Sequence, residues 1–153
     1  MAELQLTSPA FKHNESIPSQ YTCDGDNVVP PLEISGVDPS AESLVLVMDD
    51  PDVPKSIRPD GMYDHWVKFN VPVGTLMIQE GKEPEGTSGL GTGGSLAYHG
   101  PCPPDREHRY FFKLYSLDTE LALEEGATKK DVEAAMEGHI IQQAELLGLY
   151  KRK

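Results

Sequence analysis

Proline and glycine interrupt this chain so often that a long regular element has little room to form. The 153 residues include 13 prolines and 14 glycines, and they occur along the whole sequence. Proline removes a backbone donor and glycine loses much conformational freedom on folding, so both tend to end helices and strands. Many short segments between such breaks are typical of a many-stranded β fold.

Six segments have the composition of strands: residues 4–8, 31–35, 43–49, 64–71, 74–80 and 109–117. The segment SLVLVMD at 43–49 is apolar on both faces, which predicts a central strand buried between two layers. In RYFFKLYSL at 109–117, both alternating faces carry aromatic or apolar side chains, so we expect this strand to be largely covered as well.

One helix is predicted over residues 128–147. Thr128 and Asp131 have the spacing of a capping box, and an apolar stripe follows at helical intervals. Gly138 weakens the middle of this helix by about 1 kcal/mol relative to alanine and marks a bend. The tail 144–152 has an alternative reading as a last short strand. The glycine-rich segment 81–98 is predicted to be a long loop, either functional or mobile.

The acidic charge of the chain argues against two classes of partner. The formal net charge is −12, so the surface repels nucleic-acid backbones and anionic lipid head groups. No apolar run is long enough to cross a bilayer, and no signal peptide is visible. We therefore expect one cytoplasmic domain over residues 1–153, with no nucleic-acid binding and no stable membrane insertion, as a monomer or a homodimer.

Three carboxylates follow the predicted central strand. Asp49, Asp50 and Asp52 surround Pro51, which fixes the turn and holds the carboxylates at the end of the strand. The simplest interpretation is a plain turn in which aspartate accepts from loop amides. Three buried carboxylates without partners would be unfavourable, so we expect cationic or donor groups nearby, with the histidines as natural candidates.

Two histidines and a tyrosine lie where such donors are expected. His65 lies within a predicted strand, His108 precedes another, and Tyr110 points to the same side as His108. A strand histidine is more often an ordinary core residue. If an aspartate orients it, however, its second nitrogen points at a ligand, and the group becomes a donor-rich site for phosphate or carboxylate.

Other chemistries are less favoured by the residues. His65, His108 and Asp50 are of the residue types that bind metals, but the chain has no HxH or HExxH pair. A small hydrolase needs a nucleophile such as Thr92, Ser95 or Cys102, and the GxSxG pattern is absent. The sequence GTGGS lacks the remainder of a phosphate-binding loop.

The two cysteines leave two states open. Cys23 and Cys102 both lie in loops rich in glycine or proline, and their spacing fits no zinc or thioredoxin motif. They are either a pair of reduced thiols, as a cytosolic setting favours, or a disulfide between the two loops.

Four motifs together resemble the phosphatidylethanolamine-binding protein family, which includes Raf kinase inhibitor protein. They are DDPDVP, DHWVKFNVP, YHGPCPP and HRYFFKLYSLD, and YTCDGDNVVPPLEIS is similar to the N-terminal part of the short bacterial and archaeal branch. The resemblance covers nearly the whole chain. It implies a mainly β fold, a Greek-key β-sandwich with one or two peripheral helices.

The resemblance also implies a small-anion pocket without a metal or cofactor. Carried over by position, its ligand-binding residues are Asp50, Asp52, Pro54, His65, Gly100, Pro101, His108 and Tyr110. The expected function is non-enzymatic binding of phosphate or phosphorylated head groups such as phosphoethanolamine. Carboxylates beside an anion call for a protonated histidine, so affinity is expected to rise as the pH falls through the histidine range.

A second function suggested by the same family is inhibition of a protease or kinase through a surface loop such as 51–62 or 81–95. The chain is shorter than the eukaryotic members, and its 53–64 loop differs from theirs. These departures put kinase inhibition and lipid capture in doubt. The physiological ligand and any protein partner stay unidentified at the level of sequence.

Overall fold

The fold is mainly β, a Greek-key sandwich of two sheets with one α-helix. A computed structural model describes residues 3–152. The large sheet has the strand order β2-β9-β8-β4-β5-β7, and the small sheet has the order β1-β3-β6. Its elements are β1 Gln5–Thr7, β2 Glu15–Ser16, the short 3-10 helix η1 Ser19–Tyr21, β3 Leu32–Ser35, β4 Ser43–Asp50, β5 Tyr63–Val71, β6 Met77–Ile78, β7 Thr87–Ser88, β8 His108–Leu117, α1 Lys129–Met136 and β9 Ile140–Tyr150.

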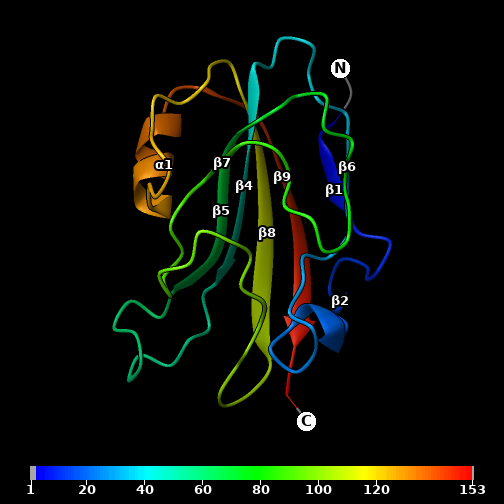
Figure 1. Ribbon diagram of the computed structural model, residues 1–153, viewed down its shortest axis with the longest axis vertical. Helices are drawn as coiled ribbons and strands as arrows, with labels where there is room; N and C mark the ends of the chain where they lie inside the picture. The colour runs from blue at the N-terminus through cyan, green and yellow to red at the C-terminus, as the bar shows by residue number, and fades with distance from the viewer. Residues whose placement is uncertain (1–2, 153) are drawn as a thin grey trace.

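Strand β4 lies at the centre of the large sheet and is buried along all eight residues. It pairs antiparallel with β5 on one side and with β8 on the other. Leu44, Leu46 and Met48 pack into the core beneath the small sheet. Val45 and Val47 point the opposite way, into a second core under α1. The two-sided apolar pattern of 43–49 is therefore explained by layers on both faces (Figure 1).

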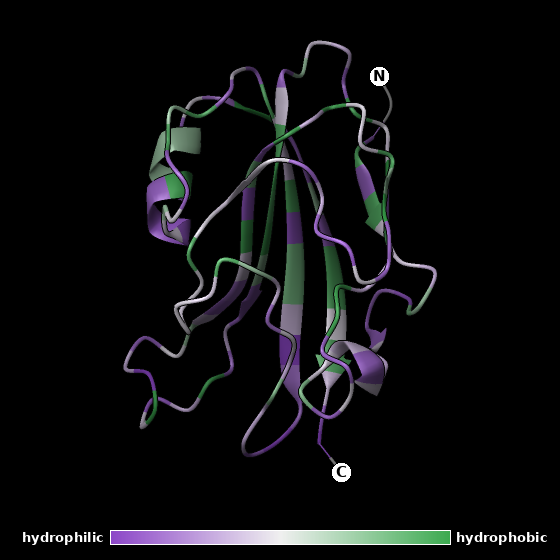
Figure 2. Cartoon of the chain, in the orientation of Figure 1, coloured by the Kyte–Doolittle hydropathy of each residue, from purple (hydrophilic) through white to green (hydrophobic). Residues whose placement is uncertain are grey.

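Strand β8 is covered mainly on one face. Tyr110, Phe112 and Leu114 are buried in the core beneath the small sheet, while Phe111 and Lys113 on the other face are half-buried. Figure 2 shows hydrophobic segments in green along these central strands. Strand β8 lies beside β4 rather than beside β7, the strand that precedes it in the chain, so the connection crosses over the sheet as in a Greek key.

The helix predicted over 128–147 is wrong beyond Met136. The capping box of Thr128 and Asp131 is present at its start, as the spacing predicts. Gly138 has a φ of 82°, which glycine adopts at little cost and which ends the helix instead of bending it. From Ile140 the chain is strand β9, which pairs with β8 over its whole length. Burial against β8 outweighs the helical periodicity of this segment.

Two further predictions need correction in extent. Only Met77 and Ile78 of the predicted strand 74–80 form a strand, β6, which pairs with β3. The segment 81–98 contains the short strand β7 and is anchored beside β5. Its Glu83 carboxylate accepts hydrogen bonds from the Trp66 indole, at 2.9 Å, and from the Tyr98 amide, at 3.0 Å.

Gly138→Ala tests the reason why α1 ends where it does. A Cβ at this position would have no neighbour within 4 Å, so the substitution changes only the backbone preference. We expect the free energy of unfolding to fall by about 1 kcal/mol because alanine disfavours a positive φ. Gly74→Ala is the matched control, since it is equally open and has no positive φ. Equal urea-unfolding midpoints for the two variants would contradict this explanation.

Candidate functional site

A small cavity lies where β4 ends and β8 begins. Asp50 is the last residue of β4 and His108 the first of β8, and the loops that follow and precede them gather at the same end of the large sheet (Figure 1). The cavity measures about 250 Å³. It is lined by Asp50, Val53, Ile57, Tyr63, His65, His99, Cys102, Pro103, Pro104, His108 and Tyr110.

A buried histidine between two carboxylates forms one wall. His108 Nδ1 lies 2.7 Å from Asp50 Oδ2, and His108 Nε2 lies 2.6 Å from Asp105 Oδ1. Burial raises the pKa of Asp50, and the hydrogen bonds from His108 and from the Asp52 amide offset part of that rise. The hydrogen bond from His108 lowers the pKa of Asp105, which is more exposed.

This triad has consequences for a ligand. Both bonds of His108 form together when the ring carries two protons, or when the ring is neutral and Asp50 keeps its own proton. The three groups carry a net charge of about −1 in either case. Both ring nitrogens of His108 face carboxylates, so His108 shapes and orients the wall and has no free donor to offer.

The turn after β4 is held by its own aspartates. Asp50 Oδ1 accepts from the Asp52 amide at 2.7 Å. The Asp52 carboxylate accepts from the Arg109 guanidinium at two positions, both at 2.9 Å, and also from the Arg109 amide. The guanidinium lowers the pKa of Asp52. Asp52 therefore ties the turn to the start of β8 and does not line the cavity.

Asp49 points away from this cavity, toward α1. Its Oδ2 lies 3.0 Å from Lys113 Nζ and 3.2 Å from Lys129 Nζ. Lys129 also lies 3.0 Å from Asp64 Oδ1. The partners of the third carboxylate are thus lysines, not histidines.

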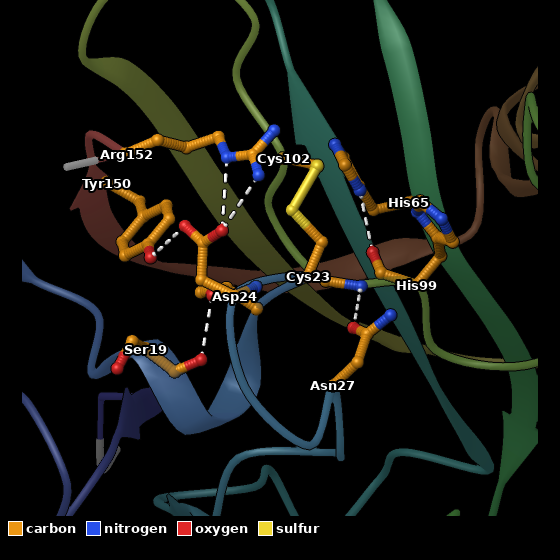
Figure 3. Close-up of a disulfide and its surroundings, with 11 residues drawn as sticks. Ser19, Cys23, Asp24, Asn27, His65, His99, Cys102, Tyr150 and Arg152 are labelled. Atoms are coloured by element: carbon orange, nitrogen blue, oxygen red, sulfur yellow. Dashed lines mark hydrogen bonds and ion pairs between the residues drawn. A yellow bond between two sulfur atoms is a disulfide. The ribbon is translucent and has the colours of Figure 1, made fainter.

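His65 is fixed by the loop that crosses it. Its Nδ1 lies 2.6 Å from the carbonyl oxygen of His99, as Figure 3 shows. Burial lowers the pKa of His65 to about 4, against the smaller opposing effect of that hydrogen bond. His65 is therefore neutral between about pH 5 and 8, and it does not supply the positive charge that the sequence suggested for an anion.

Tyr110 presents a hydroxyl that the protein leaves unused. Its side chain is fully buried, and its Oη makes no hydrogen bond to any residue from 3 to 152. Burial and, next, the charge of Asp50 raise the pKa of this hydroxyl far above its usual range. Tyr110 therefore keeps its proton, and this lining residue has a buried hydroxyl that is a donor without a partner.

Aromatic rings make up much of the remaining surface. The His65 ring lies 4.7 Å from Tyr63, 5.9 Å from His99 and 5.4 Å from Tyr110, measured between ring centroids. Ile57, whose side chain is 59% exposed, and two prolines complete the apolar rim. No lysine or arginine belongs to the described lining.

The loop that carries His99 is held against the loop around η1. A disulfide joins Cys23 and Cys102, which settles the alternative that the sequence left open (Figure 3). The Gly100 amide donates to Asn27 Oδ1 at 2.7 Å. A Cβ at Gly100 would collide with the Tyr21 carbonyl oxygen, so the two loops approach each other too closely for any other residue.

The structure brings together half of the residues predicted for the site. Asp50, His65, His108 and Tyr110 line the cavity, whereas Asp52, Pro54, Gly100 and Pro101 are not among its lining residues. Pro54 begins the turn that continues through Ile57 and Arg58, and the Pro101 carbonyl accepts from the Cys23 amide. These four residues position the two loops.

Sequence reasoning missed His99 and Tyr63 as lining residues. His99 lies within the motif YHGPCPP, and Tyr63 lies directly before the motif DHWVKFNVP. Tyr63 pairs with Asp50 across β4 and β5, a register that only the folded sheet defines. For His99 the sequence offers only a weak indication, namely that this histidine directly precedes Gly100 of the proline-rich loop.

The three nucleophiles considered for a hydrolase are all engaged or remote from the cavity. Cys102 is in the disulfide, Thr92 Oγ1 accepts from the Asp64 amide, and Ser95 Oγ contacts the backbone of Ala97. Among residues 3–152, no group of three or more histidine, cysteine or acidic side chains is arranged to hold a metal ion. In that same part of the chain, no helix is both long and apolar enough to span a membrane.

Comparison with known proteins gives consistent matches over nearly the whole chain. The sequence model of the phosphatidylethanolamine-binding protein family matches residues 7–151. A UPF0098 protein of Chlamydia pneumoniae is 48% identical over 149 residues, which cover 97% of this chain and 99% of that protein. A UPF0098 protein of the archaeon Methanothermobacter thermautotrophicus is also 48% identical, over 155 residues covering 97% of this chain and 99% of that one.

Solved structures agree with these sequences. The crystal structure of a putative phosphatidylethanolamine-binding protein homolog from Chlamydia trachomatis superposes with a TM-score of 0.97 and 45% identity, covering all of both chains. Escherichia coli YbcL, described as a new member of the mammalian PEBP family, superposes with a TM-score of 0.88 and 27% identity, covering 99% of this chain and all of its own.

Two buried tyrosines provide a test of the unused hydroxyl. We expect Tyr110→Phe to raise the free energy of unfolding by about 1 kcal/mol, because it removes a buried donor without a partner. Tyr98→Phe is the matched control. The Tyr98 hydroxyl donates to the Tyr21 carbonyl at 2.8 Å, so its removal should lower stability by about 1–2 kcal/mol. Urea unfolding in phosphate-free buffer measures both, and a loss of stability in Tyr110→Phe would show that its hydroxyl is satisfied.

The disulfide between the two loops should be a major source of stability. The bridge closes a separation of 79 residues in the chain, and constraining an unfolded loop of that length is worth about 4 kcal/mol. We therefore expect the double variant Cys23→Ser, Cys102→Ser to unfold at much lower urea concentration than the oxidised wild type. A reductant should shift the wild type alone. Unfolding of the wild type that is insensitive to reductant would contradict the expectation.

Proposed function

Since this chain belongs to the phosphatidylethanolamine-binding protein family, we propose that it binds a small anion in the cavity between β4, β5 and β8. The ligand is phosphate or a phosphorylated head group such as phosphoethanolamine. Binding is reversible, and no bond of the ligand is made or broken.

The observation that carries this proposal is the Tyr110 hydroxyl. A buried polar group without a partner reduces stability, and such groups are rare in folded proteins. Tyr110 belongs to the lining of the cavity, and it keeps its proton. A ligand oxygen bonded to this hydroxyl satisfies it and accounts for its retention in the core.

The size and composition of the cavity support a small ligand. A volume of about 250 Å³ is below the usual range for drug-sized ligands, so a head group fits and a large substrate does not. The lining is mostly apolar and aromatic, with a few polar atoms that orient the ligand. Because the protein has a net charge of −12, its overall electrostatic field repels an anion. Local hydrogen bonds therefore supply the affinity.

The lining also supports binding without turnover. Cys102, a nucleophile by type, is held in the disulfide, and the Asp50–His108 pair has a second carboxylate on its far side where a catalytic dyad would have a nucleophile. An activated nucleophile requires a base within hydrogen-bond reach. No serine, threonine or free cysteine lines the described cavity.

Phosphate titrations followed by NMR of the histidine rings test the proposal. In the wild type, we expect His65, His99 and His108 to shift with phosphate and with phosphoethanolamine, while the exposed His139 does not. Tyr110→Phe should weaken binding by about tenfold through the loss of one buried hydrogen bond. Tyr115→Phe, the same change on the outer face of β8, should leave it unaltered. Absence of shifts at millimolar ligand, or equal affinity in Tyr110→Phe, contradicts the proposal.

A further inference from the structure

We propose that the cavity selects oxyanions that carry a hydroxyl group, such as inorganic phosphate or a singly protonated phosphomonoester, over proton-free oxyanions such as sulfate. This inference rests on the proposed anion-binding function and adds a rule for which anions are accepted. It follows from the positions of the hydrogen-bond donors and acceptors that line the cavity.

The tautomer of His65 is fixed by its contact with the loop at His99. Its Nδ1 lies 2.6 Å from the His99 carbonyl oxygen, and a carbonyl oxygen can only accept (Figure 3). Nδ1 therefore carries the proton. In a neutral imidazole the other nitrogen, Nε2, then has a lone pair and accepts. Nε2 makes no hydrogen bond to a residue in the described range, so it is the ring nitrogen left for a ligand.

The His65 ring also stays neutral. Its surroundings are known on every side: His99 and His108 disfavour its protonation, Asp49 favours it, and the rings of Tyr63 and Tyr110 pack against it. Burial outweighs the rest and lowers the pKa of His65 to about 4. Over the pH range in which phosphate changes its protonation state, His65 is therefore a hydrogen-bond acceptor and not a cationic donor.

Tyr110 supplies a hydrogen-bond donor near this acceptor. The Tyr110 ring lies 5.4 Å from the His65 ring at an angle of 73°, and its hydroxyl is an unbonded donor. Among the lining residues, His65 Nε2 is therefore an unpartnered acceptor and the Tyr110 hydroxyl an unpartnered donor, and His99 Nδ1 is a further ring nitrogen without a partner. A P–OH group donates to His65 while a neighbouring P–O oxygen accepts from Tyr110. Sulfate brings only acceptors, so one of its oxygens must face the lone pair of His65 or leave that nitrogen without a partner.

The charges around the cavity act in the same direction. The Asp50–His108–Asp105 triad offers no free donor, and no lysine or arginine lines the described cavity. A fully deprotonated anion would then be desolvated beside carboxylates without a compensating cation. A singly charged ligand such as dihydrogen phosphate carries less charge than sulfate, and any ligand that keeps a hydroxyl supplies the donor that His65 lacks.

Three ligands separate the possibilities in isothermal titration calorimetry at about pH 5.5 and about pH 8: inorganic phosphate, sulfate and methyl phosphate. Phosphate keeps a hydroxyl at both values, and we expect it to bind at least about tenfold more tightly than sulfate at each, since a mismatch leaves a buried polar group unpaired. A phosphomonoester loses its hydroxyl with a pKa of about 6, so the affinity of methyl phosphate should fall about 80-fold between the two values.

The outcomes distinguish this inference from the function on which it rests. Equal binding of sulfate and phosphate, or methyl phosphate affinity that does not change with pH, overturns the selection rule and leaves anion binding intact. No binding of any of the three ligands overturns both.

A variant and a spectroscopic measurement test the role of His65 directly. His65→Gln introduces an amide that can donate or accept, so we expect the ratio of phosphate to sulfate affinity to fall toward one. His139→Gln, at an exposed site bonded to Asp118, is the control and should keep the wild-type ratio. If His65→Gln does not fold, the ring ¹⁵N shifts of wild-type His65 decide. A neutral ring protonated at Nδ1 is expected, and protonation at Nε2 overturns the proposal.

Discussion

The pairing of β4 with β8 is the constraint on which the rest of this molecule depends. It places a strand that is buried on both faces at the centre of the large sheet, so that one core lies beneath the small sheet and another beneath α1. It also brings Asp50, at the end of β4, to within 2.7 Å of His108, at the start of β8. The two strands that pair at the centre of the sheet therefore each have one end at the cavity, where Asp50 and His108 form part of its wall.

The two loops that complete the cavity are rigid for separate reasons. The turn after β4 is held by Asp50, Asp52 and Arg109 through charged hydrogen bonds. The loop before β8 is held by the Cys23–Cys102 disulfide and by the bond from the Gly100 amide to Asn27. These contacts lie within the protein itself, so under the proposed function the cavity is formed before a ligand binds.

Sequence reasoning located most of the strands and one wall of the site because those features are local. The buried pattern of 43–49 and the proline between the aspartates can be recognised without knowing the fold. The strand β9 was recognised only as an alternative for residues 144–152, because the segment has a helical periodicity that yields to pairing with β8. The second carboxylate partner of His108, Asp105, was equally hidden. Asp105 lies only three residues away, but its contact with Nε2 depends on how the intervening loop turns.

The same limit explains why the sequence suggested donors where the structure has an acceptor. Histidine, tyrosine and aspartate can each be assigned to a pocket by motif, but whether a ring nitrogen donates or accepts is set by the atom that its other nitrogen meets. For His65 that atom is a backbone carbonyl of the loop at His99, which no motif specifies. A backbone contact thus decides whether the other ring nitrogen of His65 donates or accepts. The chemistry of this cavity is therefore determined as much by the loop that crosses it as by the side chains that line it.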